Sequence, residues 1–247
     1  MLGALVLGVA GCGGEQPEQV APSGAGPSVI DLSGWKLSIP VKNNKGHPTL
    51  LQPAYTVAPW MVSDPSGALV FWAPSKGVTT DNSDHPRTEL DSLATFNAGQ
   101  STRTLRASVT LQQVPTDGQG IILGQIHGAE DISAVPYVML RYQQGKVRVV
   151  VKQVQDGDDL INYPLLAEVP LNSRFDFTIS DLGNGNMTFS ATRDGNTQQV
   201  TAPVPAAFSG ATVRFQVGDY QQSDDPAGAQ DGGRVVFHQL VESPSPL

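Results

Sequence analysis

Short segments in which apolar and polar residues alternate recur along this chain, and turns rich in glycine, asparagine and aspartate separate them. In residues 104–111 (TLRASVTL), alternate side chains are apolar and therefore share one face of an extended strand. Further β-branched or aromatic segments lie at residues 147–154, 175–179, 187–193, 212–217 and 234–241. No segment shows the periodicity of a convincing amphipathic helix. The pattern predicts an all-β fold, a jelly-roll sandwich of two antiparallel sheets.

Composition narrows the possible partners. The chain has 247 residues with 26 glycines and 19 prolines, which suits one large domain with many turns. Its formal net charge of −8 argues against the broad basic face that non-specific nucleic-acid binding needs, so we expect no nucleic-acid partner. A polyanionic ligand would require cations gathered in a cleft, with the acidic residues elsewhere.

The N-terminal region has the character of an export signal. Residues 1–11 are apolar or small and uncharged, and Val9-Ala10-Gly11-Cys12 resembles a bacterial lipobox. Cys12 is the single cysteine, so no intrachain disulfide can form. We therefore expect a lipoprotein signal over residues 1–12 with lipidation at Cys12, a flexible tether over 13–28 and one folded domain over 29–247. The expected product is a monomeric, exported lipoprotein, periplasmic or at the cell surface, anchored to a membrane through Cys12.

Three strand-like segments carry polar groups that are unusual for a merely solvated face. They are Pro86-Arg87-Thr88-Glu89-Leu90, Gly124-Gln125-Ile126-His127 and the stretch from Arg214 to Gln222 (RFQVGDYQQ). In a strand, residues two apart share a face, so Arg87 lies with Glu89 and Gln125 with His127. Arg214, Gln216, Tyr220 and Gln222 likewise share a face. A sheet face of Arg, Gln, His and Tyr favours a binding groove.

These segments resemble the alginate lyases of polysaccharide lyase family 7, which carry R-[TS]-E-L, Q-[IV]-H and Y-F-K-x-G-x-Y-x-Q motifs in this order. The early segment 34–40 (GWKLSIP) also resembles the first strand of that family, and the likeness covers about residues 30–240. The resemblance implies a jelly roll with a concave groove that holds an acidic polysaccharide, alginate. It also implies four catalytic positions, which match Arg87, Gln125, His127 and Tyr220 here.

The chemistry of β-elimination is consistent with these residue types. The proton at C5 of a uronate is removable only if the adjacent carboxylate is neutralised, for which Arg87 and Gln125 are suitable donors. Neutral His127 would act as the base, since an unperturbed histidine has a pKa of ~6.5. Tyr220 would protonate the leaving glycosidic oxygen, or serve as both base and acid on a suitable substrate. The scheme needs no metal and no cofactor.

The roles expected for the flanking residues are less directly tied to the reaction. We expect Glu89 to orient Arg87, and we place Glu89, Arg214, Gln216 and Gln222 among the residues that bind substrate. His47, His85 and His238 have no motif support and are expected to be structural.

The chain also departs from the family pattern. Asp91 replaces the arginine that usually follows R-T-E-L, Gln216 replaces a lysine, and Arg214 replaces an aromatic residue. Two cations that usually meet substrate carboxylates are thus missing. In the family, Q-I-H tends to accompany activity on guluronate-containing stretches. The leading hypothesis is an alginate lyase with that preference. The alternatives are a lyase for another polyuronate such as polyglucuronate, and a non-catalytic glycan-binding jelly roll.

Overall fold

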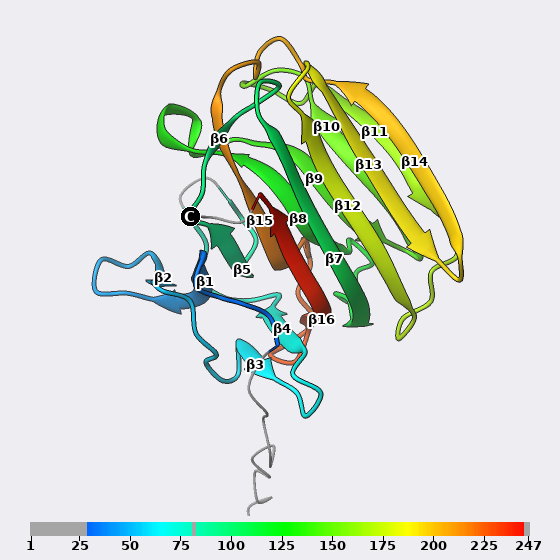
Figure 1. Cartoon of the computed structure of the whole chain (residues 1–247). Helices are drawn as coiled ribbons and strands as arrows, with labels where there is room; N and C mark the ends of the chain where they lie inside the picture. The colour runs from blue at the N-terminus through cyan, green and yellow to red at the C-terminus, as the bar shows by residue number, and fades with distance from the viewer. Residues whose placement is uncertain (1–28, 81–82, 245–247) are drawn as a thin grey trace, which may run out of the picture.

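The computed structural model describes residues 29–80 and 83–244, and strands make up nearly all of its regular structure. Two antiparallel sheets pack face to face in the predicted jelly-roll sandwich (Figure 1). The sheet that we call the site sheet contains, in spatial order, β11 (Leu160–Leu166), β10 (Lys146–Lys152), β9 (Pro136–Gln143), β8 (Ile121–Gly128), β15 (Thr212–Gln221), β5 (Arg87–Ser92), β1 (Trp35–Lys42) and β2 (Pro48–Leu51), with β6 (Phe96–Asn97) paired to β15.

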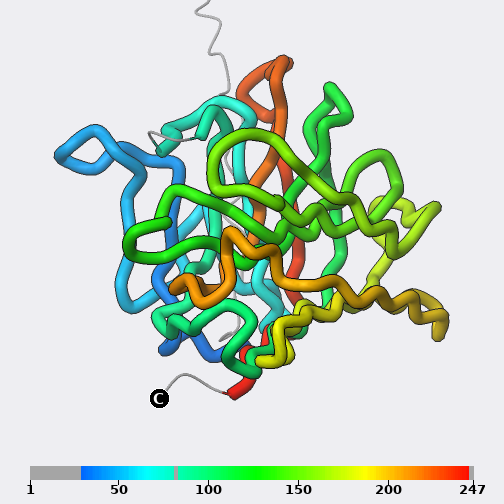
Figure 2. Tube along the Cα trace, turned by 90° about the horizontal axis from the view of Figure 1, so that it is seen from above, coloured from blue at the N-terminus to red at the C-terminus, as the bar shows by residue number. Residues whose placement is uncertain are grey.

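The second sheet, the back sheet, covers the inner face of the site sheet. In spatial order it contains β14 (Asn196–Pro203), β13 (Asn186–Arg193), β12 (Arg174–Leu182), β7 (Thr102–Gln113), β16 (Gly232–Ser243), β4 (Leu69–Pro74) and β3 (Met61–Ser63). One short 3-10 helix, η1 (Glu130–Ile132), lies between β8 and β9. The β1–β2 hairpin, in blue, and the β13–β14 hairpin, in yellow, mark opposite ends of the molecule when it is viewed from above (Figure 2).

The inner faces of the two sheets form one apolar core. Alternate residues of β7, including Leu105, Val109 and Leu111, are buried as the alternation in the sequence predicted. Eight phenylalanines are among the buried side chains, and they are Phe71, Phe96, Phe175, Phe177, Phe189, Phe208, Phe215 and Phe237. Burial of this apolar surface, at about 25 cal/mol per Å², is the main force that holds the sheets together.

All of the segments predicted as strands are strands in the structure, and the structure adds others that the sequence pattern did not reveal. β11 and β14 lie at the free edges of their sheets, and most of their side chains are exposed. An edge strand with little buried surface shows weak apolar alternation, which explains why these two were missed.

The predicted signal, lipidated Cys12 and tether lie outside the described residues, so those expectations remain predictions. No helix in the described part of the chain is long and apolar enough to cross a bilayer.

Candidate active site

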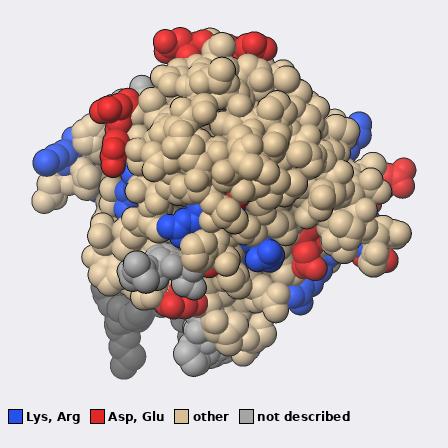
Figure 3. Space-filling view, turned by 45° about the horizontal axis from the view of Figure 1, so that its top comes forward, with Lys and Arg blue, Asp and Glu red and all other residues tan. Residues whose placement is uncertain are grey.

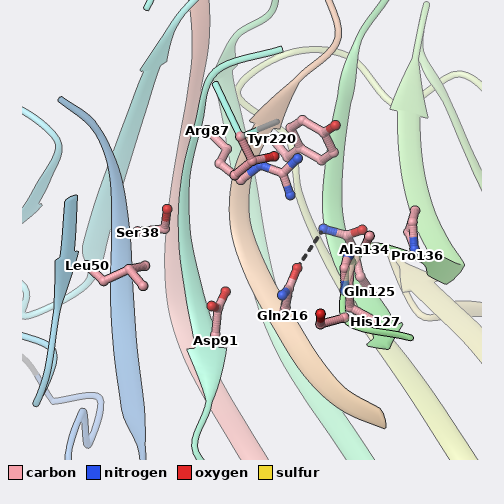
Figure 4. A pocket seen from close by; sticks show the side chains of 12 residues that line it. Ser38, Leu50, Arg87, Asp91, Gln125, His127, Ala134, Pro136, Gln216 and Tyr220 are labelled. Atoms are coloured by element: carbon pink, nitrogen blue, oxygen red, sulfur yellow. Dashed lines mark hydrogen bonds between the residues drawn. The ribbon is translucent and has the colours of Figure 1, made fainter. Parts of the chain in front are cut away.

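A pocket opens on the outer face of the site sheet, above β5, β8 and β15. It brings together all four residues predicted to be catalytic (Figure 4). The residues that line it are Ser38, Leu50, Thr80, Arg87, Asp91, Gln125, His127, Ser133, Ala134, Pro136, Gln216 and Tyr220. Strands β5, β8 and β15 are central in the sheet, so the floor of the pocket is rigid, whereas β2 and the segment between β8 and β9 supply its walls.

Strand register places the polar side chains of the floor in rows across the sheet. Gln216 of β15 pairs with Gln125 of β8 on one side and with Asp91 of β5 on the other, and Asp91 pairs in turn with Lys36 of β1. On one side of this row, Arg214 pairs with His127. The alternation of each strand thus directs polar groups to the pocket while neighbouring apolar residues enter the core.

A second row carries Tyr220 and Arg87, which are paired across β15 and β5. The guanidinium carbon of Arg87 lies 3.5 Å from the centre of the Tyr220 ring, a close cation–π contact. The pairing of β15 with β8 is irregular between Val217 and Tyr220, while its pairing with β5 stays regular. Arg87 and Tyr220 therefore form one stacked unit at the edge of the pocket.

Glu89 holds two of the predicted catalytic groups from below. Its carboxylate accepts a hydrogen bond from Arg87 Nη1 at 3.1 Å and one from Gln125 Nε2 at 2.7 Å. It reaches across Gly218, its partner on β15; a side chain at Gly218 would collide with the backbone of Thr88 and Glu89. Burial raises the pKa of Glu89 to about 7, and the charge of Arg87 opposes that rise.

His127 is set up as a neutral base. Its Nδ1 lies 3.0 Å from the carbonyl oxygen of Gly128, and a carbonyl can only accept, so Nδ1 carries the proton and Nε2 keeps its lone pair. Burial lowers the pKa of His127 to about 4; the hydrogen bond to Gly128 opposes this shift and the charge of Arg87 adds to it. The imidazole is consequently unprotonated at neutral pH.

The hydroxyl of Tyr220 is hydrogen-bonded to that of Ser83 at 2.8 Å. Ser83 also accepts from the backbone N–H of His85, whose ring lies 6.3 Å from the Tyr220 ring, centre to centre. The ring of His85 is held at its other side by the carbonyl of Ser223, 3.1 Å from Nδ1. Ser83 and His85 therefore fix the phenol from outside the sheet. The sequence offered no motif for either residue, because both lie on an irregular segment and meet Tyr220 only in the fold.

The four residues predicted to bind substrate occupy different positions. Gln216 lines the pocket. Glu89 is completely buried, so it contacts Arg87 and Gln125 and has no surface to offer a substrate. Arg214 is half-buried beside His127, just outside the lining residues. Gln222 follows the end of β15 and donates to the backbone carbonyls of Tyr220 and Gln221 instead of facing the pocket.

His238 and the charged groups of the surface lie outside this pocket. His238 lies on the back sheet, where Nε2 is 3.0 Å from the hydroxyl of Thr110, consistent with a structural role. On the face seen in Figure 3, uncharged residues form most of the surface, and acidic and basic groups lie in small separate clusters. Within the described residues, no group of three or more His, Cys, Asp or Glu side chains could hold a metal ion.

A sequence model of the alginate lyase family matches residues 30–243. The chain belongs to this family. An alginate lyase is a polysaccharide lyase, and the convergence of the three motifs on one pocket is consistent with that activity. A comparison with curated protein sequences found no match.

Solved alginate lyases share this fold. The structure of alginate lyase A1-II′, a member of polysaccharide lyase family 7, is 29% identical with a TM-score of 0.72, over 88% of this chain and 97% of that one. The alginate lyase PA1167 from Pseudomonas aeruginosa is 24% identical with a TM-score of 0.73, over 86% of this chain and 99% of that one. The alginate lyase from Klebsiella pneumoniae is 22% identical with a TM-score of 0.73, over 86% and 95%. The latter two likenesses support the fold alone.

Proposed function

We propose that this alginate lyase cleaves its polymer by β-elimination, with Arg87 and Gln125 neutralising the uronate carboxylate, His127 removing the C5 proton and Tyr220 protonating the leaving oxygen. The observation that supports these roles is the convergence of all four side chains, from three adjacent strands, on one pocket. Elimination needs these groups around one sugar ring, because proton removal and C–O cleavage occur at neighbouring carbons.

The carboxylate of the reacting uronate binds at Arg87 and Gln125. Gln125 Nε2 donates to Glu89 at 2.7 Å but lies 3.4 Å from Gln216 Oε1, which is a weak contact. The second amide proton can therefore turn to the substrate. Neutralisation by a cation and an amide donor lowers the energy of the enolate-like intermediate, in which negative charge spreads from C5 onto the carboxylate oxygens.

Nε2 of His127 takes the C5 proton, and the electron pair of that C–H bond forms the double bond between C4 and C5. The C4–O bond breaks, and the glycosidic oxygen receives the proton of the Tyr220 hydroxyl. Solvent then reprotonates the phenolate, while His127 loses its proton to solvent. The anionic carboxylate near His127 strengthens a base whose pKa is about 4 in the free enzyme, since nearby negative charge favours the imidazolium.

Ultraviolet absorbance measures the reaction directly, because elimination creates a double bond conjugated with the carboxylate. We expect alginate to give rising absorbance with the wild-type protein, and turnover to fall by about 100-fold or more in His127→Ala and Tyr220→Phe. His238→Ala and Tyr163→Phe are matched controls, since His238 lies on the back sheet and Tyr163 packs against Phe189 on β13. Wild-type rates in His127→Ala and Tyr220→Phe would refute the assigned roles.

The same assay compares polymers. We expect guluronate-containing alginate to be the preferred substrate, on the basis of Ile126 in the second motif. Polyglucuronate is the competing substrate. The pocket contains Asp91 and Gln216 at the two positions where the family motifs usually have cations that meet alginate carboxylates. Faster product formation from polyglucuronate than from any alginate fraction would show that polyglucuronate, and not alginate, is the preferred substrate.

We also propose that the mature protein is an exported, monomeric lipoprotein anchored through Cys12, on the basis of the apolar residues 1–11 and the lipobox-like sequence before Cys12. Mass spectrometry of the mature N-terminus should find a lipidated cysteine. Cys12→Ala should release the protein from the membrane fraction. An unmodified Cys12 in membrane-free protein would contradict this proposal.

A further inference from the structure

The pocket contains a carboxylate that the proposed reaction does not use. Asp91 lines the pocket and keeps 9% of its surface exposed, so a bound sugar can reach it. Its Oδ2 lies 3.4 Å from Nζ of Lys36, its neighbour on β1. Figure 4 shows the carboxylate of Asp91 directed into the pocket from β5, on the side opposite His127 and Gln125.

The cation of Lys36, in contact with Asp91, favours the anionic form of this carboxyl group. Burial raises the pKa of Asp91, and the charges of Lys36, Arg214 and Arg87 oppose that rise, Lys36 most strongly. Lys36 is also the cation in direct contact. The pair is therefore a fixed dipole in the pocket floor. Its negative group faces the ligand, and its compensating cation lies to the β1 side.

The cations of the pocket floor are largely committed to carboxylates of the protein itself. Arg87 is paired with Glu89 at 3.1 Å, and Lys36 with Asp91 at 3.4 Å. A polyuronate carries one carboxylate on every sugar unit, and the proposed reaction uses Arg87 and Gln125 for one of them. A neighbouring unit that presented its carboxylate to Asp91 would meet a like charge at short range in a poorly solvated site.

We propose that Asp91, held by Lys36, is a specificity-determining residue that accepts the hydroxyl-bearing edge of the sugar next to the reacting unit and rejects a carboxylate there. This inference rests on the proposed polyuronate lyase function. A carboxylate oxygen is a strong acceptor for sugar hydroxyls, and Lys36 lowers the free-energy cost of keeping Asp91 charged in the pocket floor. The enzyme thus binds its polymer in the orientation that turns the adjacent carboxylate away from β5.

Asp91→Asn tests this, because it removes the charge and keeps the shape. We expect KM for alginate at low ionic strength to fall about threefold to tenfold, with the change confined to KM, and the difference to shrink as salt screens the charge. Lys36→Gln should have the opposite sign, since it leaves Asp91 uncompensated, and should raise KM several-fold. On partially esterified alginate, the difference in KM between Asp91→Asn and the wild type should also diminish, because fewer charged carboxylates of the polymer lie near Asp91.

Asp158→Asn is the matched control, with the same change in net charge in an exposed turn between β10 and β11. An unchanged or raised KM in Asp91→Asn, or a lowered KM that is independent of salt, would overturn the proposal. Polymer affinity measured in the His127→Ala background gives the same comparison without turnover. Absence of unsaturated product from the wild type would defeat the proposed function, whereas equal alginate affinity with and without the Asp91→Asn substitution at low salt would defeat this inference alone.

Discussion

Replacing Glu89 by glutamine should separate the stability of this protein from its activity. The side chain is completely buried, and its carboxylate bonds both Arg87 and Gln125. Its pKa is raised from 4.5 to about 7, chiefly by burial. Between these two values the folded protein binds one more proton than the unfolded chain, so the free energy of unfolding decreases as pH rises.

The size of this loss follows from the shift. Each pKa unit corresponds to about 1.4 kcal/mol, so ionisation of Glu89 costs about 3 kcal/mol of stability between pH 4.5 and pH 8. Glutamine has nearly the same shape and no ionisable proton, so Glu89→Gln should lack this contribution. Carboxyl groups whose raised pKa does not depend on the charge of Glu89, such as Asp181, contribute equally to both proteins and cancel in the comparison.

Urea unfolding at several pH values from 5 to 8 measures the difference. We expect the stability of Glu89→Gln relative to the wild type to increase by up to about 3 kcal/mol across this range. Activity should change in the opposite direction. Glutamine offers one acceptor oxygen where Glu89 offers two, so either Arg87 or Gln125 loses its partner, and kcat/KM should fall by about 10-fold to 100-fold. The wild-type kcat/KM should rise as Glu89 ionises near pH 7, since His127 is already neutral there, and this step should be absent in the variant.

Two results would refute this reasoning. Parallel stability profiles for the two proteins would mean that folding does not raise the pKa of Glu89 above 4.5. A step in kcat/KM at the same pH in both proteins would assign the acid limb to another group, with His127 the first candidate.

Three further predictions concern the support of the site. Ser83→Ala should lower kcat a few-fold with little change in KM, because Tyr220 loses the partner that holds its hydroxyl at 2.8 Å; equal kcat values would exclude a positioning role. Gly218→Ala should destabilise the protein by about 1–3 kcal/mol in urea unfolding, since the added methyl group meets the Thr88 carbonyl; wild-type stability would contradict this. Asp219→Asn should flatten the decline of stability as pH rises above the ordinary carboxyl pKa of 3.8, because burial raises the pKa of this carboxyl in the folded protein and its Oδ1 makes no hydrogen bond within the described residues; an unchanged profile would show that folding does not raise the pKa of Asp219.

The sequence alone determined the fold class and the identity of the reactive groups. Alternation with a period of two is a local property, so the strands that bury one face, such as residues 104–111, could be predicted without tertiary information. The same alternation indicated that Gln125 and His127, or Gln216 and Tyr220, share a face. The family resemblance added the order of the motifs and the roles of the four residues.

Only the tertiary structure decided how these groups are supported. Ser83 and Tyr220 are 137 positions apart, and Gln125 and Glu89 are 36 apart, so no local pattern links them. The burial of Glu89 depends on the glycine opposite it, and the pairing of Asp91 with Lys36 depends on the register between β5 and β1. Register is set by the packing of whole sheets, because a shift of one residue would turn every side chain to the other face. For that reason the sequence could name the reactive residues, while the charges and contacts that tune them follow from the fold.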